Sequence, residues 1–255
     1  MNFIFDSILL ASLLFIAILV CVEIGYRMGN RSHRSGDPKA IGGGVIDGAI
    51  FALLGLLVAF TFSGAAERFD KRRGLIVAEA NAIGTAYMRL SLLPAPARDE
   101  LKEQFRNYVD TRLDVYRVLP DIAASKADLA KADRIEQQIW EKAVAASDGS
   151  QSTRILLLPA INEMNDIATS RTMAAITHPP LVIFGLLFGL SLITALLAGR
   201  AMASNVGRPW MHAILYALAM AGAVFVIVDM EYPRLGFIRL DSFDSVLADL
   251  RQSMN

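Results

Sequence analysis

The apolar residues of this chain gather in four runs that contain no charged side chain, two near the start of the sequence and two near its end. The runs are residues 7–22, 48–66, 179–199 and 212–228. A bilayer core about 30 Å thick is crossed by about 20 residues of α-helix. The second and third runs meet this length, and the first and fourth meet it if flanking side chains reach the membrane interface. We therefore predict four transmembrane helices.

The first run also fits a cleavable signal peptide, which has an apolar segment of similar length. However, no Lys or Arg precedes this run, and no small-x-small cleavage site follows it cleanly. We therefore expect residues 7–22 to be retained as a membrane helix.

Residues 67–178 carry the mixture of charged and apolar positions that is typical of a helical domain outside the membrane. No helix-stop signal follows the second run until Pro94, so we predict one continuous helix from residue 48 to about residue 93. Apolar positions at helical spacing predict three further helices, starting near residue 98, over 125–146 and over 152–176. We expect Pro159 to kink the last helix or to delay its start.

Two of these helices have an apolar stripe that we expect to form core contacts within the domain or between subunits. The stripes are Leu101, Phe105, Val109, Leu113 and Val118 on the first helix, and Leu156, Ile161, Met164, Ile167 and Met173 on the last. The predicted organisation is a first transmembrane pair (1–66), a helical domain (67–178), a second transmembrane pair (179–230) and a C-terminal tail (231–255). The predicted fold class is an all-α integral membrane protein with a helical extramembrane middle domain.

Composition agrees with this organisation and excludes several classes of function. The chain is 54% hydrophobic and 20% charged, whereas an average soluble domain is about 45–50% apolar and about 25% charged. Its 25 basic and 25 acidic side chains balance, so nothing indicates a nucleic-acid-binding surface. Cys21 is the only cysteine and the three histidines are widely separated in the sequence, so we expect no metal site and no cofactor.

The common enzyme motifs are missing from the sequence. It has no Gly-x-Ser-x-Gly, no His-Glu-x-x-His and no Walker glycine loop. Glu79 and Asn81 are polar positions on the long helix, and we assign them to helix packing or to the wall of a vestibule. We therefore expect that the protein is not an enzyme.

The second apolar run has two neighbouring stripes. Its small residues recur at spacings of four, three, four and four, which places them along one side of a helix: Gly48, Ala52, Gly55, Ala59 and Ser63. Small residues at such spacing let another helix backbone approach closely in lipid. Leu56 and Phe60, one turn apart, run beside them. Such a helix suits either a packed bundle or the wall of a pore.

Residues 56–73 resemble the second transmembrane helix of the bestrophin family. That helix has a phenylalanine, an Ala-x-x-Arg, a pair of aromatic residues and another arginine, and the matching positions here are Phe60, Ala65, Arg68, Phe69 and Arg73. Asp70 departs from the pattern, because it replaces the second aromatic residue. The order of two spans, a helical middle domain, two more spans and a tail also resembles the family.

A second match follows the last apolar run. Glu231 and Pro233 are similar to the Glu-x-Pro segment that follows the last membrane helix of the family, although Arg234 stands where the family usually has phenylalanine. The calcium-binding acidic cluster of the animal members has no counterpart, because the acidic residues in this part of the sequence are scattered: Asp229, Glu231, Asp241 and Asp244. We therefore expect no calcium site.

The resemblance implies a homopentameric ion channel whose second helices line one central pore. Counted back from Arg68, the family's neck positions fall on Ala52, Leu56 and Phe60. Rings of Leu56 and Phe60 would obstruct ions by excluding water, and Ala52 would widen the first ring. The implied partners are lipid and small inorganic ions. A bacterial inner membrane is implied as the location, with the middle domain and both termini in the cytoplasm. Lys and Arg are nearly balanced between the two sides, so the positive-inside rule does not decide the orientation.

The sign of the conducted ion stays open at this level. Asp47, at the mouth of the second helix, would favour cations if it faced the pore, whereas Arg68, Arg72 and Arg73 would favour anions at the other end. Charges at the ends of spans are also common interface anchors. The alternative function is a non-conducting membrane scaffold or sensor whose helical middle domain binds a partner.

Overall fold

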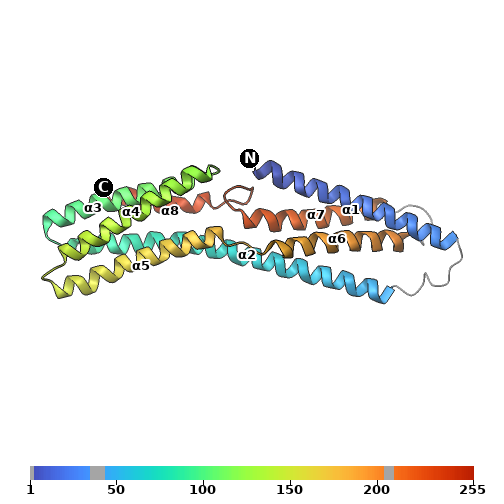
Figure 1. The fold of residues 1–255 in the computed structure, drawn as a ribbon, viewed down its shortest axis with the longest axis horizontal. Coiled ribbons are helices and arrows are strands. Elements are labelled where there is room, and N and C mark those ends of the chain that lie inside the picture. The colour runs from blue at the N-terminus through green and yellow to red at the C-terminus, as the bar shows by residue number, and fades with distance from the viewer. Residues whose placement is uncertain (1–2, 35–43, 204–209) are drawn as a thin grey trace. The chain divides into compact units, whose positions relative to one another are not determined.

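The computed structural model describes residues 3–34, 44–203 and 210–255, and within these ranges the chain forms helices and no strand (Figure 1). The elements are α1 (Phe3–Arg34), α2 (Gly44–Arg89), the 3-10 turn η2 (Leu90–Leu92), α3 (Ala95–Arg117), α4 (Ile122–Ala146), α5 (Gln151–Ile176), α6 (Leu181–Met202), α7 (Trp210–Glu231) and α8 (Asp241–Ser253). Among the described residues, four helical stretches are long and apolar enough to cross a membrane: Ser7–Ser32, Gly44–Leu92, Gln151–Met202 and Trp210–Glu231. The predicted fold class is confirmed.

The chain divides into two compact units. The membrane unit comprises the described residues of Met1–Glu67 and His178–Tyr232, and the helical unit comprises Arg68–Thr177 and Pro233–Asn255. Helix α2 belongs to both units and continues without a break from Gly44 to Arg89, as the sequence predicted. It ends before Pro94 because the residue that precedes a proline is held in an extended conformation, here Leu93 with ψ of 154°.

The last part of the chain is more ordered than a simple tail. Residues from Pro233 onward belong to the helical unit, and α8 buries Leu247 in its core. The backbone carbonyl of Met254 accepts hydrogen bonds from Tyr87 Oη (2.9 Å) and Arg106 Nε (2.8 Å). These contacts attach the C-terminal helix to α2 and α3.

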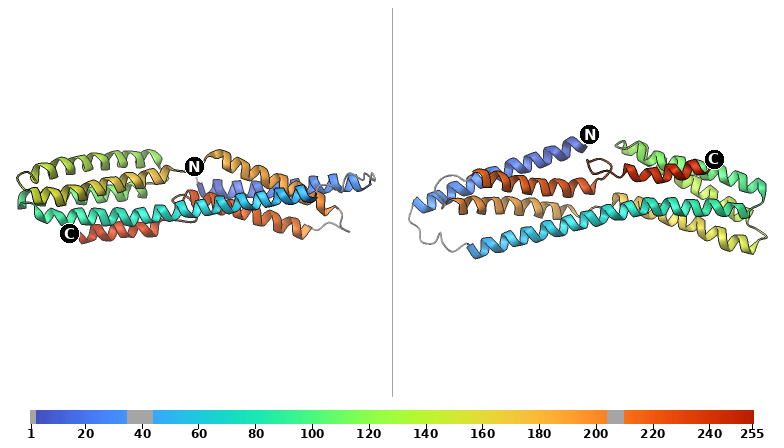
Figure 2. Two further views of the ribbon diagram at one scale, coloured as in Figure 1. Left: turned by 90° about the horizontal axis from the view of Figure 1, so that it is seen from below. Right: turned by 180° about the vertical axis from the view of Figure 1, so that it is seen from behind.

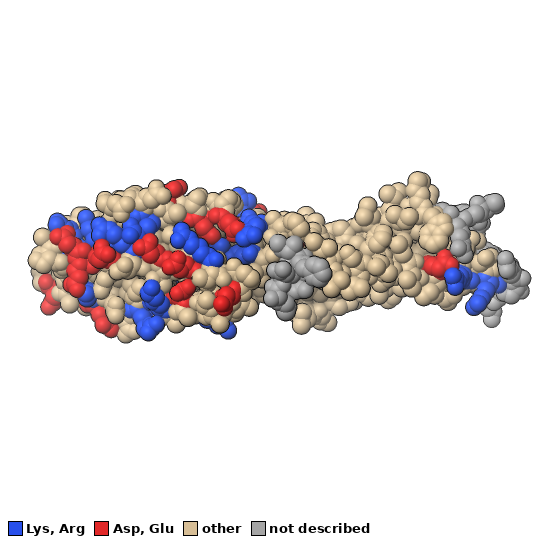
Figure 3. All heavy atoms as spheres, turned by 90° about the horizontal axis from the view of Figure 1, so that it is seen from above, with Lys and Arg blue, Asp and Glu red and all other residues tan. Residues whose placement is uncertain are grey.

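The membrane unit has an apolar core to which all four of its helices contribute. The buried residues are Leu14, Ile18 and Val22 of α1, Leu54 and Ala65 of α2, Leu187, Leu190 and Ala195 of α6, and Ala213, Ala217, Val224 and Ile227 of α7. Thr194 Oγ1 and Tyr216 Oη lie 2.6 Å apart and join α6 to α7. In the face that Figure 3 shows, charged side chains crowd over the helical unit and are sparse over the membrane unit. This distribution is the one expected for a lipid-facing surface.

The helical unit packs α3, α4 and α5 beside the second half of α2 (Figure 2). Its core is built from buried apolar residues of each helix, including Ile83, Phe105, Ile139, Leu157 and Leu247. Helix α4 begins at Ile122, three residues earlier than predicted, because the Asp121 carboxylate accepts hydrogen bonds from the backbone of Ala123 and Ala124.

Three details of α5 and α3 differ from one form of the expectation. Helix α5 has already begun at Gln151, so Pro159 lies inside the helix and does not delay its start. Leu156 and Met173 are exposed in a single copy, so they make no core contact within it, and Leu157 takes the buried position. Val118 lies beyond the last residue of α3, as its C-terminal cap.

Candidate functional site

The neck positions that the resemblance implies lie on the uncovered side of α2. Leu56 is 53% exposed and Phe60 67% exposed, and Ala52 is exposed as well. Leu54 and Ala65, by contrast, face the apolar core and are only 3% and 0% exposed. A spacing of four residues keeps Ala52, Leu56 and Phe60 on one face of the helix. This face is therefore open to lipid or to another protein chain.

The small residues of α2 are also uncovered. A Cβ atom added at Gly48 or Gly55 would meet nothing within 4 Å, and Ala59 and Ser63 are exposed. In the most apolar stretch of α2 only 6% is buried by the described chain, against 22–28% in the other three stretches. The membrane-spanning part of α2 therefore has the smallest buried share of the four stretches.

The charged residues predicted for the pore mouths have different surroundings. Asp47 is half-buried in the first turn of α2, and Arg68 and Phe69 are half-buried further along the helix. Arg72 is buried and donates to the backbone carbonyls of Ala174 (3.0 Å) and Thr177 (2.9 Å). Its positive charge therefore sits at the C-terminal end of α5, where it stabilises the helix dipole.

Arg73 makes two contacts inside the helical unit. Its guanidinium donates to Asp70 at 3.0 Å and lies 4.5 Å from the centre of the Phe243 ring. Asp70, the residue that departs from the family pattern, therefore partners the arginine of that pattern. The contact with Phe243 connects α2 to α8.

The residues of the second family match lie at the end of the membrane unit. Glu231 is wholly buried, and its carboxylate lies 3.7 Å from His178 Nδ1. The His178 ring stacks on Tyr232 with 4.5 Å between ring centroids. Pro233 is the first residue of the returning segment of the helical unit, and its carbonyl accepts a hydrogen bond from Leu240.

The acidic residues near this match are divided between the two units. Asp229 and Glu231 belong to the membrane unit, and Asp241 and Asp244 to the helical unit. Asp241 pairs with Arg239 at 2.6 Å. Over residues 3–34, 44–203 and 210–255, no group of three or more His, Cys, Asp or Glu is placed to hold a metal ion.

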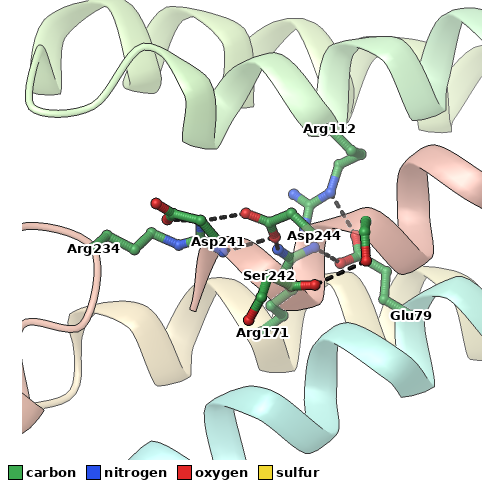
Figure 4. Close-up of polar contacts among 8 residues, drawn as sticks. Glu79, Arg112, Arg171, Arg234, Asp241, Ser242 and Asp244 are labelled. Atoms are coloured by element: carbon green, nitrogen blue, oxygen red, sulfur yellow. Dashed lines mark hydrogen bonds and ion pairs between the residues drawn. The ribbon is translucent and has the colours of Figure 1, made fainter. Parts of the chain in front are cut away.

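The helical unit contains a buried ionic cluster that the sequence did not predict (Figure 4). Its centre is Glu79, which is 0% exposed and accepts hydrogen bonds from Arg112 Nε at 2.6 Å and from Arg171. Arg171 also donates to Asp244 at 3.0 Å. Asp244 in turn receives two hydrogen bonds from Arg234, at 2.6 and 2.9 Å. The cluster, defined as these five residues, joins α2, α3, α5, α8 and the segment before α8.

An aromatic ring completes the cluster. The guanidinium carbons of Arg171 and Arg234 each lie 4.1 Å from the centre of the Tyr116 ring, a distance at which cations are attracted to the ring face. Burial alone would lower the pKa of Arg112, but the neighbouring Glu79 carboxylate holds that pKa above its ordinary value. Arg112 therefore stays charged although it is buried.

The sequence contains a weak indication of this cluster. Glu79 lies on the apolar stripe of α2 between the buried residues Ile76 and Ile83, and Arg112 lies on that of α3 between Tyr108 and Val115. A charged residue at a core position of an amphipathic helix indicates a buried partner. The sequence alone does not say which residue that partner is.

Comparison with known proteins identifies the family. The sequence model of the bestrophin-like domain matches residues 13–242, whereas curated proteins give no match. Similar solved structures include three variants of a bacterial bestrophin homolog from Klebsiella pneumoniae. Their TM-scores are 0.68, 0.70 and 0.69, at 15%, 14% and 16% identity, covering 94% of this chain and 98%, 98% and 97% of theirs. At this identity the structures establish a shared fold.

The family match extends over most of the sequence and includes both segments in which the resemblance was found. The four apolar helical stretches agree with it. The chain is therefore a multi-pass membrane protein that belongs to the bestrophin-like family, a family of ion channels.

Proposed function

We propose that this chain forms a pentameric ion channel in which α2 lines a central pore. The observation that carries the proposal is the uncovered face of α2 with Ala52, Leu56 and Phe60, in a chain of a channel family. Rings of Leu56 and Phe60 form an apolar neck that obstructs ions by excluding water, and the smaller Ala52 leaves a wider first ring.

The filled interior of the membrane unit supports a ring of subunits. Ile18, Leu187 and Ala217 are completely buried where α1, α6 and α7 contribute to the apolar core. An aqueous path through the interior of one copy would have to displace these side chains. An aqueous path between copies needs only the uncovered face of α2. Cyclic symmetry closes the copies into a ring around such a path. The small residues Gly48, Gly55 and Ala59 allow neighbouring helices to approach closely there.

The charged residues of α2 would be repeated around the ring. We place Asp47 at one mouth of the neck and Arg68, Arg72 and Arg73 at the other mouth or in the vestibule beyond it. Ala65 and Phe69, with Glu231 and Pro233, have structural roles in this arrangement. The conducted species are small inorganic ions. The channel resides in the inner membrane of a bacterium, with the helical unit and both termini in the cytoplasm.

Truncating the neck residues is the direct test. In planar-bilayer recordings of purified protein, Leu56→Ala and Phe60→Ala are expected to raise single-channel conductance several-fold, because a wider and less apolar neck is more easily wetted. Phe62→Ala is the matched control. Phe62 is also exposed, at 45%, but it lies about 200° around the helix from Phe60 and should leave the conductance unchanged.

The oligomer mass in detergent supplies the second measurement. Five copies are expected. A silent bilayer together with a monomeric or dimeric mass would reject the channel and favour the scaffold or sensor. Equal effects of Phe60→Ala and Phe62→Ala would reject the assignment of the neck while keeping the channel.

A further inference from the structure

The face of α4 that packs into the helical unit carries the ionisable residue Glu136 between core positions. Ala132, Ile139 and Ala143 are buried in the same apolar core as Tyr108 of α3. Glu136 lies four residues after Ala132 and three before Ile139, which places it on the same face of the helix. Its side chain is half-buried. A carboxyl group therefore lies between core residues of α4.

The opposite helix carries two donors that lack an acceptor. Tyr108 and Arg112 are one turn apart on α3, and both are almost completely buried. Within the part of the chain that the structure describes, neither Tyr108 Oη nor Arg112 Nη2 has a hydrogen-bond partner. Buried polar atoms are nearly always hydrogen-bonded, so we expect each of these two donors to have an acceptor.

The charges of the ionic cluster favour an acidic acceptor. As defined above, the cluster has three guanidiniums, those of Arg112, Arg171 and Arg234, and two carboxylates, those of Glu79 and Asp244. Asp241 lies near Arg234 at 3.9 Å but pairs more closely with Arg239, at 2.6 Å. One further carboxylate beside Arg112 would balance the cluster.

The other ionisable groups that face Glu136 oppose its negative charge. They are Asp133 on α4 itself, Glu79 on α2 and Asp166 on α5, while Arg112 on α3 is the cation that favours it. Burial is the largest effect and Asp133 the next, and together they raise the pKa of Glu136 to about 7. The carboxyl group therefore gains or loses its proton near neutral pH.

We propose that Glu136 is a proton-operated switch in the contact between α4 and α3. With its proton bound, the neutral carboxyl rests beside the acidic side chains of Asp133 and Asp166. When the proton leaves to solvent, the carboxylate turns to Tyr108 Oη and Arg112 Nη2. Helix α4 shifts with it, because the same face of the helix carries Ile139 and Ala143. The switch is a property of the helical unit and is independent of ion conduction.

Hydrogen–deuterium exchange of the purified full chain tests the switch. The protection of peptides from α4, corrected for the intrinsic effect of pH on exchange, is expected to change with a midpoint near pH 7. Glu136→Gln should abolish this transition. Glu141→Gln is the matched control, since Glu141 is an exposed residue of the same helix, and it should keep the transition. The three histidines of the sequence belong to the membrane unit.

Tyr108→Phe tests the proposed contact without removing the carboxyl group. It keeps the volume of the ring and deletes one of the two donors, so the midpoint should move to higher pH. A transition that survives in Glu136→Gln would overturn the proposal. A midpoint that stays in place in Tyr108→Phe would overturn the contact with Tyr108.

Discussion

Replacing Glu79 by glutamine is expected to destabilise the helical unit by about 3–5 kcal/mol, because it removes the carboxylate shared by two buried guanidiniums. Arg112 loses the carboxylate that it binds at 2.6 Å, and Arg171 keeps one carboxylate, that of Asp244. Neither arginine can become neutral by losing its proton, so each charge stays buried. Thermal unfolding of the purified full chain should therefore begin at a lower temperature, with the loss of exchange protection centred on α2, α3 and α5.

A surface pair supplies the control for this experiment. Glu103 accepts a hydrogen bond from Arg106 at 2.8 Å, but Glu103 is 62% exposed, and exposed ion pairs contribute about 0–1 kcal/mol. Glu103→Gln should therefore leave unfolding almost unchanged. Adding Arg112→Met to Glu79→Gln should restore part of the stability, because a buried charge without a partner costs more than an apolar replacement. Equal unfolding temperatures for Glu79→Gln and Glu103→Gln would contradict the role assigned to the cluster.

The sequence predicted the helices well where a local signal controls them. The charge-free runs identified the four spans, and the distance from residue 48 to Pro94 predicted the continuity of α2. Which face of α5 is buried was harder to predict, because Leu156 and Leu157 are adjacent and either one fits an apolar stripe. Packing against the other helices decides which of them is buried, and it selects Leu157.

The proposed neck and the ionic cluster also depend on packing that the sequence does not reveal. The spacing of four residues among Ala52, Leu56 and Phe60 put them on one face of α2, but their exposure depends on where the other three membrane helices pack. The ionic cluster depends on contacts across the sequence: Glu79 meets partners 33 and 92 residues away, and Arg171 meets Asp244 after 73 residues. Helical periodicity indicates that Glu79 faces the core, but it carries no information about pairs so far apart.

Replacing Gly25 by alanine is expected to have the largest effect in the membrane unit, a loss of about 1–3 kcal/mol or more. A Cβ atom on Gly25 would lie 2.0 Å from the carbonyl oxygen of Leu196, and one on Gly199 would lie 2.0 Å from that of Val22. Both obstacles are backbone atoms, so relief requires α1 and α6 to move apart. In lipid the hydrophobic effect does not drive helices together, so helices associate largely through the close packing that small residues allow.

Gly185 of α6 supplies a control that distinguishes the effect of helix packing from the effect of helix propensity. A Cβ on Gly185 would meet nothing within 4 Å, so Gly185→Ala should be neutral or stabilising by up to about 1 kcal/mol, the intrinsic gain of alanine over glycine in a helix. Gly25→Ala has the same intrinsic gain, so any net loss measured by unfolding in detergent reports the contact between α1 and α6. If both variants unfolded alike, the close approach of these two helices would not be what holds the membrane unit together.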